Sequence, residues 1–106
     1  NKLLKTRTTA DMHFIIHCTD KTGAAQVRAD NRPAHVDFLK ANRDNIYTAG
    51  PTLTDDGEGM NGSLLIVDLP DRAAVDAFAA ADPYAQAGLF ESVVIKPWKQ
   101  VFEPLS

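Results

Sequence analysis

The run Met12-His13-Phe14-Ile15-Ile16-His17-Cys18 sets the architecture that this sequence predicts, because both of its alternating faces are largely apolar. Its residues favour β structure, and the polar segment Thr19–Gly23 that follows is typical of a loop. One face carries Met12, Phe14, Ile16 and Cys18, and the other carries Ile15 between the two histidines. A strand that is apolar on both faces indicates a sheet that is covered on both faces.

The rest of the chain alternates helical and strand patterns. The predicted elements are a helix from about Ala24 to Arg43 that is interrupted near Asp30–Pro33, strands at Ile46–Ala49 and Gly62–Leu69 joined by the polar loop Thr52–Asn61, a helix at Arg72–Ala81 capped by Asp71, a turn at Asp82–Gly88 and a last strand at Phe90–Pro97. Gly50-Pro51 is expected to stop the second strand, and Pro33 suits the first turn of a helix. The order β-α-β-β-α-β predicts an α+β, ferredoxin-like fold, with a four-stranded antiparallel sheet and both helices on one face.

The later strands repeat the two-sided apolar pattern of the first. In the third strand Leu65 and Val67 oppose Leu64 and Ile66, and the last strand has Val94 between further apolar residues. Two helices cover only one face of the sheet, and an antiparallel strand that faces water usually alternates apolar with polar residues. We therefore expect a homodimer that forms through the other face.

Composition narrows the class of protein. The 106 residues fit one domain, which we expect at 12–106 after an N-terminal extension at 1–11. A formal net charge of −3 removes the electrostatic reason to expect a nucleic-acid or anionic-membrane partner, and no apolar run approaches the roughly 18 residues that span a bilayer. The one cysteine, Cys18, forms no internal disulfide and fits a small buried side chain. These features predict a cytoplasmic protein that has no nucleic-acid or membrane partner.

His35 is the first candidate functional residue. On a helical wheel it falls inside an apolar stripe that includes Phe38 and Leu39, so its imidazole is expected to be partly desolvated. An imidazole in such a place titrates near neutrality and can act as a general base. The alternative is a histidine at the edge of the core whose ring bonds a backbone carbonyl.

Asp82 is the second candidate, since it stands directly before Pro83. Proline disfavours helix in the preceding residue, so the long helix should end at Asp82. The carboxylate then has two open roles: capping the short turn that follows, or fixing the tautomer of His35 and stabilising its charged form.

Asp20 and Arg32 are weaker candidates for substrate binding. Asp20 lies just beyond the first strand, where loop residues often enter a site, although aspartate there is also ordinary turn chemistry. Arg32 could attract an anionic substrate or pair with a neighbouring acid such as Asp30. We predict no metal and no cofactor, because His13 and His17 lie roughly 13 Å apart along one strand and no phosphate-binding glycine loop is present.

Several of these segments, in this order, resemble the YciI-like (YCII-related) family of the dimeric α/β-barrel superfamily. The resemblance covers Met12 to about Phe102 and rests on the first strand with Asp20, Arg32-Pro33-Ala34-His35, Ala49-Gly50-Pro51, Gly62-Ser63, Ala81-Asp82-Pro83-Tyr84 with Ala87-Gly88, and Val94-Ile95-Lys96-Pro97. Trp98 departs from the phenylalanine usual there. The family implies a ferredoxin-like fold, a dimer, and an active site built on a histidine and an aspartate, which match His35 and Asp82, with Asp20 near them.

The resemblance leaves two function hypotheses. A degradative branch of the family resembles cofactor-independent lyases that eliminate chloride from chlorinated, hydroxylated aromatics. The first hypothesis is therefore a lyase or isomerase in which His35 removes a proton, Asp82 orients it, and Asp20 and Arg32 position a small hydroxylated or aromatic substrate. The second is a non-catalytic accessory module that binds a small molecule or anion in the same cleft, since fold alone does not fix function.

Overall fold

The computed structural model describes residues 12–104, so the expected N-terminal extension at 1–11 lies outside the described residues. The elements in chain order are β1 (Met12–Asp20), α1 (Ala25–Ala41), the short 3-10 helix η2 (Arg43–Asn45), β2 (Ile46–Leu53), β3 (Met60–Leu69), α2 (Arg72–Ala81), α3 (Pro83–Gln86) and β4 (Phe90–Trp98). Among the described residues, no helix is long and apolar enough to cross a membrane.

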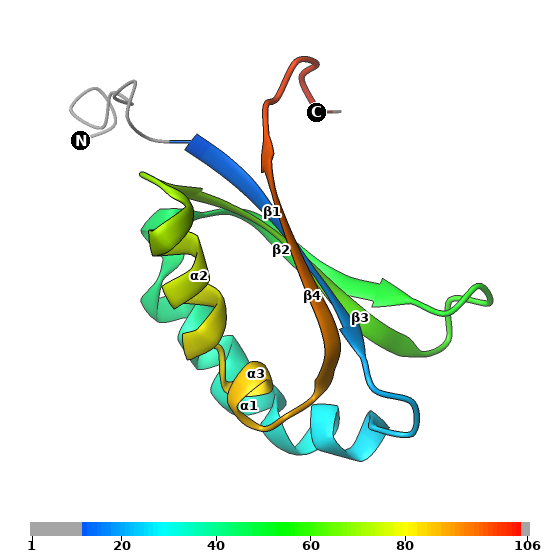
Figure 1. Cartoon of the computed structure of the whole chain (residues 1–106). Coiled ribbons are helices and arrows are strands. Elements are labelled where there is room, and N and C mark those ends of the chain that lie inside the picture. Colours follow the sequence, from blue (N-terminus) through cyan, green and yellow to red (C-terminus); the bar gives the residue numbers. More distant parts are fainter. Residues whose placement is uncertain (1–11, 105–106) are drawn as a thin grey trace.

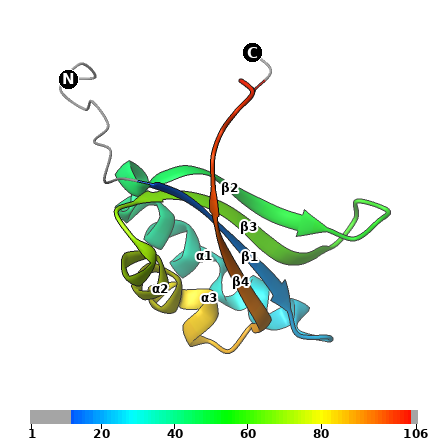
Figure 2. The ribbon, with the colours of Figure 1, turned by 45° about the horizontal axis from the view of Figure 1, so that its top comes forward.

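The strands form one antiparallel sheet in the order β2-β3-β1-β4. β1 and β3 lie at the centre, with Ile16 opposite Leu65. The helices α1, α2 and α3 gather against one face of the sheet, and no helix of residues 12–104 covers the other (Figures 1 and 2). This arrangement confirms the predicted α+β, ferredoxin-like fold.

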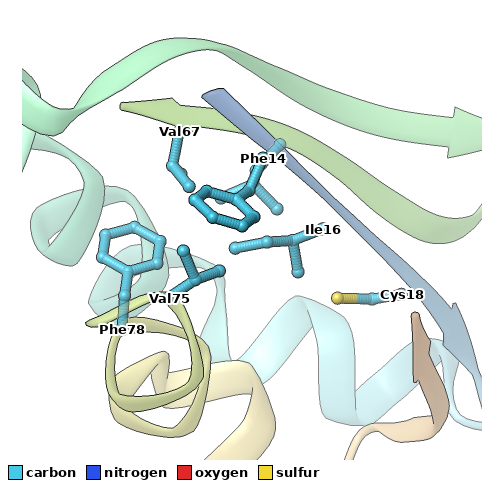
Figure 3. Close-up of a cluster of buried hydrophobic side chains, with 7 residues drawn as sticks. Phe14, Ile16, Cys18, Val67, Val75 and Phe78 are labelled. Atoms are coloured by element: carbon cyan, nitrogen blue, oxygen red, sulfur yellow. The ribbon is translucent and has the colours of Figure 1, made fainter. Parts of the chain in front are cut away.

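The core forms between the inner face of the sheet and the helices (Figure 3). Phe14, Ile16 and Cys18 of β1 point inward, as the period-two pattern predicts, and are almost fully buried. They belong to one cluster with Val75 and Phe78 of α2. The expectation of a small buried side chain at Cys18 is confirmed.

The outer face of the sheet is apolar and open in the single chain. Leu64 is 39% exposed and Val94 is 45% exposed. A shallow groove of about 430 Å³ runs across this face and is lined by Ile15, His17, Thr52, Leu64, Val94 and Lys96. The expected two-sided apolar character is therefore present.

The expected interruption of the first helix is wrong. α1 is continuous from Ala25 to Ala41, with Pro33 in its interior. Proline there leaves the carbonyl of Ala29 without its intrahelical donor. Because both Ala29 and Pro33 are exposed, water can satisfy this carbonyl. Phe38 and Leu39 pack α1 against the core.

The expected end of the second strand at Ala49 is also wrong. β2 runs on through Gly50-Pro51 to Leu53, and Pro51 lies opposite Ser63 of β3. β2 is an edge strand, so it pairs along only one side, and proline is tolerated where no ladder hydrogen bond is needed. Because β2 ends at Leu53 and β3 begins at Met60, the loop between them is shorter than the expected Thr52–Asn61. The extended part of β2 lies beside the helix face that carries His35.

Gly62 is required where three strands approach one another. It lies opposite Thr19 of β1 and Thr52 of β2. A Cβ atom added at Gly62 would overlap the backbone carbonyl oxygen of Cys18 and lie 2.6 Å from Oγ1 of Thr52. Because the first of these is backbone in the centre of the sheet, it has no rotamer by which to move away.

We expect Gly62→Ala to lower the free energy of unfolding by about 2 kcal/mol, measured by urea denaturation, because overpacking forces the central strands apart. Gly50→Ala is the matched control, since a Cβ atom there meets nothing within 4 Å. The control should stay within about 0.5 kcal/mol of the parent. Equal midpoints for the two variants would contradict this account of the sheet.

Candidate functional site

His35 and Asp82 meet in the folded chain. His35 Nδ1 lies 2.9 Å from Asp82 Oδ1, although 47 positions separate them in sequence. α1 supplies the histidine, and the junction between α2 and α3 supplies the aspartate. Both residues are buried, at 9% and 4% exposure. At Nδ1, the partner of His35 is this carboxylate and not the backbone carbonyl of the alternative interpretation.

Asp82 makes the contacts that both of its open roles require. α2 ends there because the following proline holds Asp82 in an extended conformation, with φ −60° and ψ 126°. The carboxylate then caps α3, with Oδ1 accepting a hydrogen bond from the Tyr84 backbone N–H at 2.9 Å. The same oxygen lies next to Nδ1 of His35. The capping hydrogen bond therefore also fixes the position of the carboxylate relative to the imidazole.

The geometry determines which nitrogen of His35 is available for chemistry. A carboxylate only accepts, so Nδ1 carries the hydrogen and Nε2 is the acceptor when the ring is neutral. Nε2 forms no hydrogen bond within residues 12–104, whereas every fully buried side-chain nitrogen or oxygen in that range has a partner. Nε2 is therefore accessible, and His35 lines a pocket.

This pocket of about 180 Å³ lies between α1, β2, β3 and α3. Its polar wall consists of Arg28, Arg32, His35, Ser63 and Tyr84, and part of its apolar wall consists of Val36, Leu39 and Leu65. Arg32 therefore lies where the sequence expectation needs it, at the same pocket as His35. Its proposed structural partner, Asp30, is instead bonded by Gln26 at 2.7 Å.

Asp20 contacts Arg28 instead of projecting into the pocket of His35 as expected. Its two carboxylate oxygens accept hydrogen bonds from Nε and Nη2 of Arg28, at 2.7 and 2.9 Å. The Asp20 side chain is 7% exposed and does not line the pocket of His35, but a neighbouring cavity at the end of β1. Asp20 thus acts on the pocket through Arg28.

Arg28 and Tyr84 are pocket residues that the sequence reasoning missed. The Tyr84 ring stacks on the ring of His35, with centroids 4.0 Å apart and planes 16° from parallel. The guanidinium carbon of Arg28 lies 4.6 Å from the centroid of the Tyr84 ring. Helical spacing could have found Arg28, because Arg28, Arg32 and His35 follow the i, i+4, i+7 pattern of one helix face. Tyr84 gave no comparable signal.

Burial and charge shift the pKa values of Tyr84 and of the Cys18 thiol. Burial raises the pKa of Tyr84, and the nearby charges of Arg28 and Arg32 oppose this only in part. Burial raises the pKa of Cys18 to about 12, helped by the charges of Asp82 and Asp20. Tyr84 therefore stays a neutral hydroxyl at neutral pH, and Cys18 is not a nucleophile. Within residues 12–104, no three metal-ligating side chains cluster.

The fold and the pocket together define a class of protein: small ferredoxin-like domains with a buried His/Asp pair beside a pocket. The YCII-related domain matches residues 12–99 of the chain. Over 98 residues the chain is 37% identical to protein YciI of Escherichia coli, covering 86% of this chain and 100% of that protein. The chain belongs to the YCII-related family, as its sequence motifs predict.

Solved structures give the same fold. The chain is similar to 5-chloro-2-hydroxyhydroquinone dehydrochlorinase of Burkholderia phenoliruptrix, solved in complex with 2,5-dihydroxybenzoquinone, with a TM-score of 0.79, 36% identity, and coverage of 85% of this chain and 96% of that one. It also matches a dimeric protein of ferredoxin-like fold from Bacteroides fragilis, with a TM-score of 0.51, 15% identity, and coverage of 89% and 100%. The second likeness concerns the fold alone.

Proposed function

We propose that this protein is a cofactor-independent enzyme that acts on a small hydroxylated or aromatic molecule, with His35 as general base. The observation that carries the proposal is the pairing of His35 Nδ1 with the buried carboxylate of Asp82 at 2.9 Å, which leaves Nε2 available to the pocket. A general base must present an acceptor of suitable basicity to the proton it removes. Asp82 orients the ring and stabilises the imidazolium that forms.

The reaction class is a lyase or isomerase reaction. Nε2 takes a proton from a hydroxyl group or from a carbon beside a carbonyl. The electron pair left behind forms a C=O or C=C bond. In a lyase the leaving group departs with its bonding pair, and in an isomerase the imidazolium returns the proton to another carbon. Neither outcome changes the oxidation level of the whole system, so neither requires a redox partner.

Relatives and site residues support this choice of chemistry. The dehydrochlorinase, 36% identical to this chain, is named for an elimination from a chlorinated, hydroxylated aromatic compound. In this chain we assign Arg32 to substrate binding and Asp20 to positioning through Arg28. A cytoplasmic location remains the prediction made from the single cysteine.

The test is turnover of a panel of hydroxylated and chlorinated aromatics that includes 5-chloro-2-hydroxyhydroquinone, followed by chloride release and product analysis. We expect His35→Gln to lower kcat about 10²- to 10⁴-fold, because the proton acceptor is lost. Asp82→Asn keeps an oxygen that can cap α3 but loses the charge that orients His35, so we expect kcat to fall about 10- to 100-fold with the fold intact.

Arg72→Gln is the control, because Arg72 pairs with Asp76 on α2 and lines neither the pocket nor the groove on the open face of the sheet. Its turnover should equal that of the parent. Undiminished activity in His35→Gln would refute the mechanism. Compounds that raise the melting temperature but are recovered unchanged after long incubation would instead favour the binding module.

We also assign the open face of the sheet to a homodimer interface. Its apolar side chains, among them Leu64 and Val94, are too exposed in the single chain for a stable water-facing surface. Helices already cover the opposite face, so a second copy of the same sheet face is the occupant that fits by symmetry.

Sedimentation at micromolar concentration tests the dimer. We expect a species of about twice the chain mass of 11.5 kDa, and dissociation on Val94→Lys, which places a charge in the apolar face. Val101→Lys is the control, since Val101 is 87% exposed beyond the end of β4. A single species at the monomer mass in the parent protein would contradict the proposal.

A further inference from the structure

Arg28 is a buried cation whose position is fixed on two sides. Asp20 binds it through two parallel hydrogen bonds of 2.7 and 2.9 Å, and Nη2 also donates to Ser63 Oγ at 2.9 Å. The side chains of Arg28 and Asp20 are each 7% exposed. Burial alone would lower the pKa of Arg28, but the hydrogen bonds and charge of Asp20 raise it above its ordinary value. The guanidinium is therefore permanently charged and held in one orientation.

The fixed orientation leaves N–H groups of the guanidinium for partners other than Asp20 and Ser63. The bonds to Asp20 and Ser63 use Nε and Nη2, so the remaining two N–H groups are those of Nη1. Tyr84 is a further side-chain hydrogen-bond partner of Arg28, and one hydroxyl does not occupy both of these N–H groups. Arg28 lines the pocket of His35 beside Tyr84.

The charged groups around the pocket are arranged in two layers. Among the described residues, the cations that line it are Arg28 and Arg32, and no carboxylate lines it. The carboxylates of Asp20 and Asp82 lie behind Arg28 and His35, to which they are bonded. Arg32 forms no ion pair with a carboxylate in residues 12–104. A ligand in the pocket therefore meets the cations first, and these favour negative charge.

The rest of the pocket limits the size and character of the ligand. Val36, Leu39 and Leu65 form an apolar wall, and the volume is about 180 Å³. This is smaller than the pockets that hold drug-sized ligands, which run from about 300 Å³ upward. A small apolar body that carries one charged group matches both walls.

We propose that the pocket binds its substrate as an anion, with a negatively charged oxygen on Nη1 of Arg28 and on Arg32, and an apolar body against α1 and β3. The proposal rests on the proposed function and names its substrate class: small phenolates, enolates or carboxylates. Asp20 and Ser63 are positioning residues, because they act only through Arg28. Negative charge that develops on a substrate oxygen when His35 removes a proton meets donors already in place.

Binding experiments test this proposal without any need for turnover. The probes are 2,5-dihydroxybenzoquinone, whose acidic hydroxyls make it an enolate at neutral pH, and the isosteric pair benzoate and benzamide. Isothermal titration in the His35→Gln background prevents conversion. We expect at least one anion to bind at least about tenfold more tightly than benzamide, and added salt to reduce the difference. The quinone and benzoate arms separate enolate from carboxylate recognition.

The variants identify the cation responsible. Asp20→Asn with Arg28→Gln removes both charges of the buried pair together, so that no uncompensated charge remains, and should abolish the preference for the anion. Arg32→Gln changes an exposed position, which keeps the test open if the double variant does not fold, and should reduce the preference about threefold or more. Arg72→Gln, on α2 beside Asp76, is the control and should change nothing.

Equal affinities for anion and amide, no measurable binding of either anion, or a preference that survives in both the folded double variant and Arg32→Gln would overturn the proposal. If the double variant does not fold, a full preference in Arg32→Gln alone would overturn it. Failure of the proposed function has a different signature, which is turnover that survives His35→Gln while anion binding is intact.

Discussion

One oxygen atom, Oδ1 of Asp82, connects α1 to the junction of α2 and α3 beside the pocket. It accepts from the Tyr84 N–H at the start of α3 and faces His35 of α1, while its own backbone ends α2. Because a single acceptor serves both contacts, the position of the imidazole depends on the same turn that ends the helix. The site is therefore as rigid as the backbone around Pro83, and catalytic groups gain from such fixed placement.

Two buried acid–base pairs contact the Tyr84 ring. His35 stacks on this ring and is bonded to Asp82, and Arg28 lies over the same ring and is bonded to Asp20. Buried ion pairs contribute little net stability compared with apolar residues of similar size, since desolvation offsets their attraction. Two such pairs in a domain of 106 residues are better explained by what their outward-facing nitrogens do in the pocket than by a need for stability.

Much of the fold follows from local pattern, and the errors have local causes. The apolar residues on both faces of Phe14–Cys18 predict a strand in a sheet that is covered on both faces. Pro33 and Gly50-Pro51 look like breaks in the sequence, although α1 and β2 continue through them, because their solvent exposure is not visible in sequence. Local pattern leaves the pairing of His35 with Asp82 as one of two open roles of Asp82, because spacing does not establish a contact across 47 positions, and the family resemblance favours it. Arg28 could have been predicted as a pocket residue, because its spacing from His35 places both on one face of a helix.

The tautomer of His35 tests the central claim most directly. Long-range ¹⁵N–¹H NMR correlation at a pH where the ring is neutral distinguishes the two nitrogens in the parent protein and in Asp82→Ala, which removes the acceptor. Because Asp82 accepts from Nδ1, the account predicts the Nδ1–H tautomer in the parent and a shift toward the Nε2–H form in Asp82→Ala. An Nε2–H tautomer in the parent, or a His35 signal that does not respond to Asp82→Ala, would contradict the account.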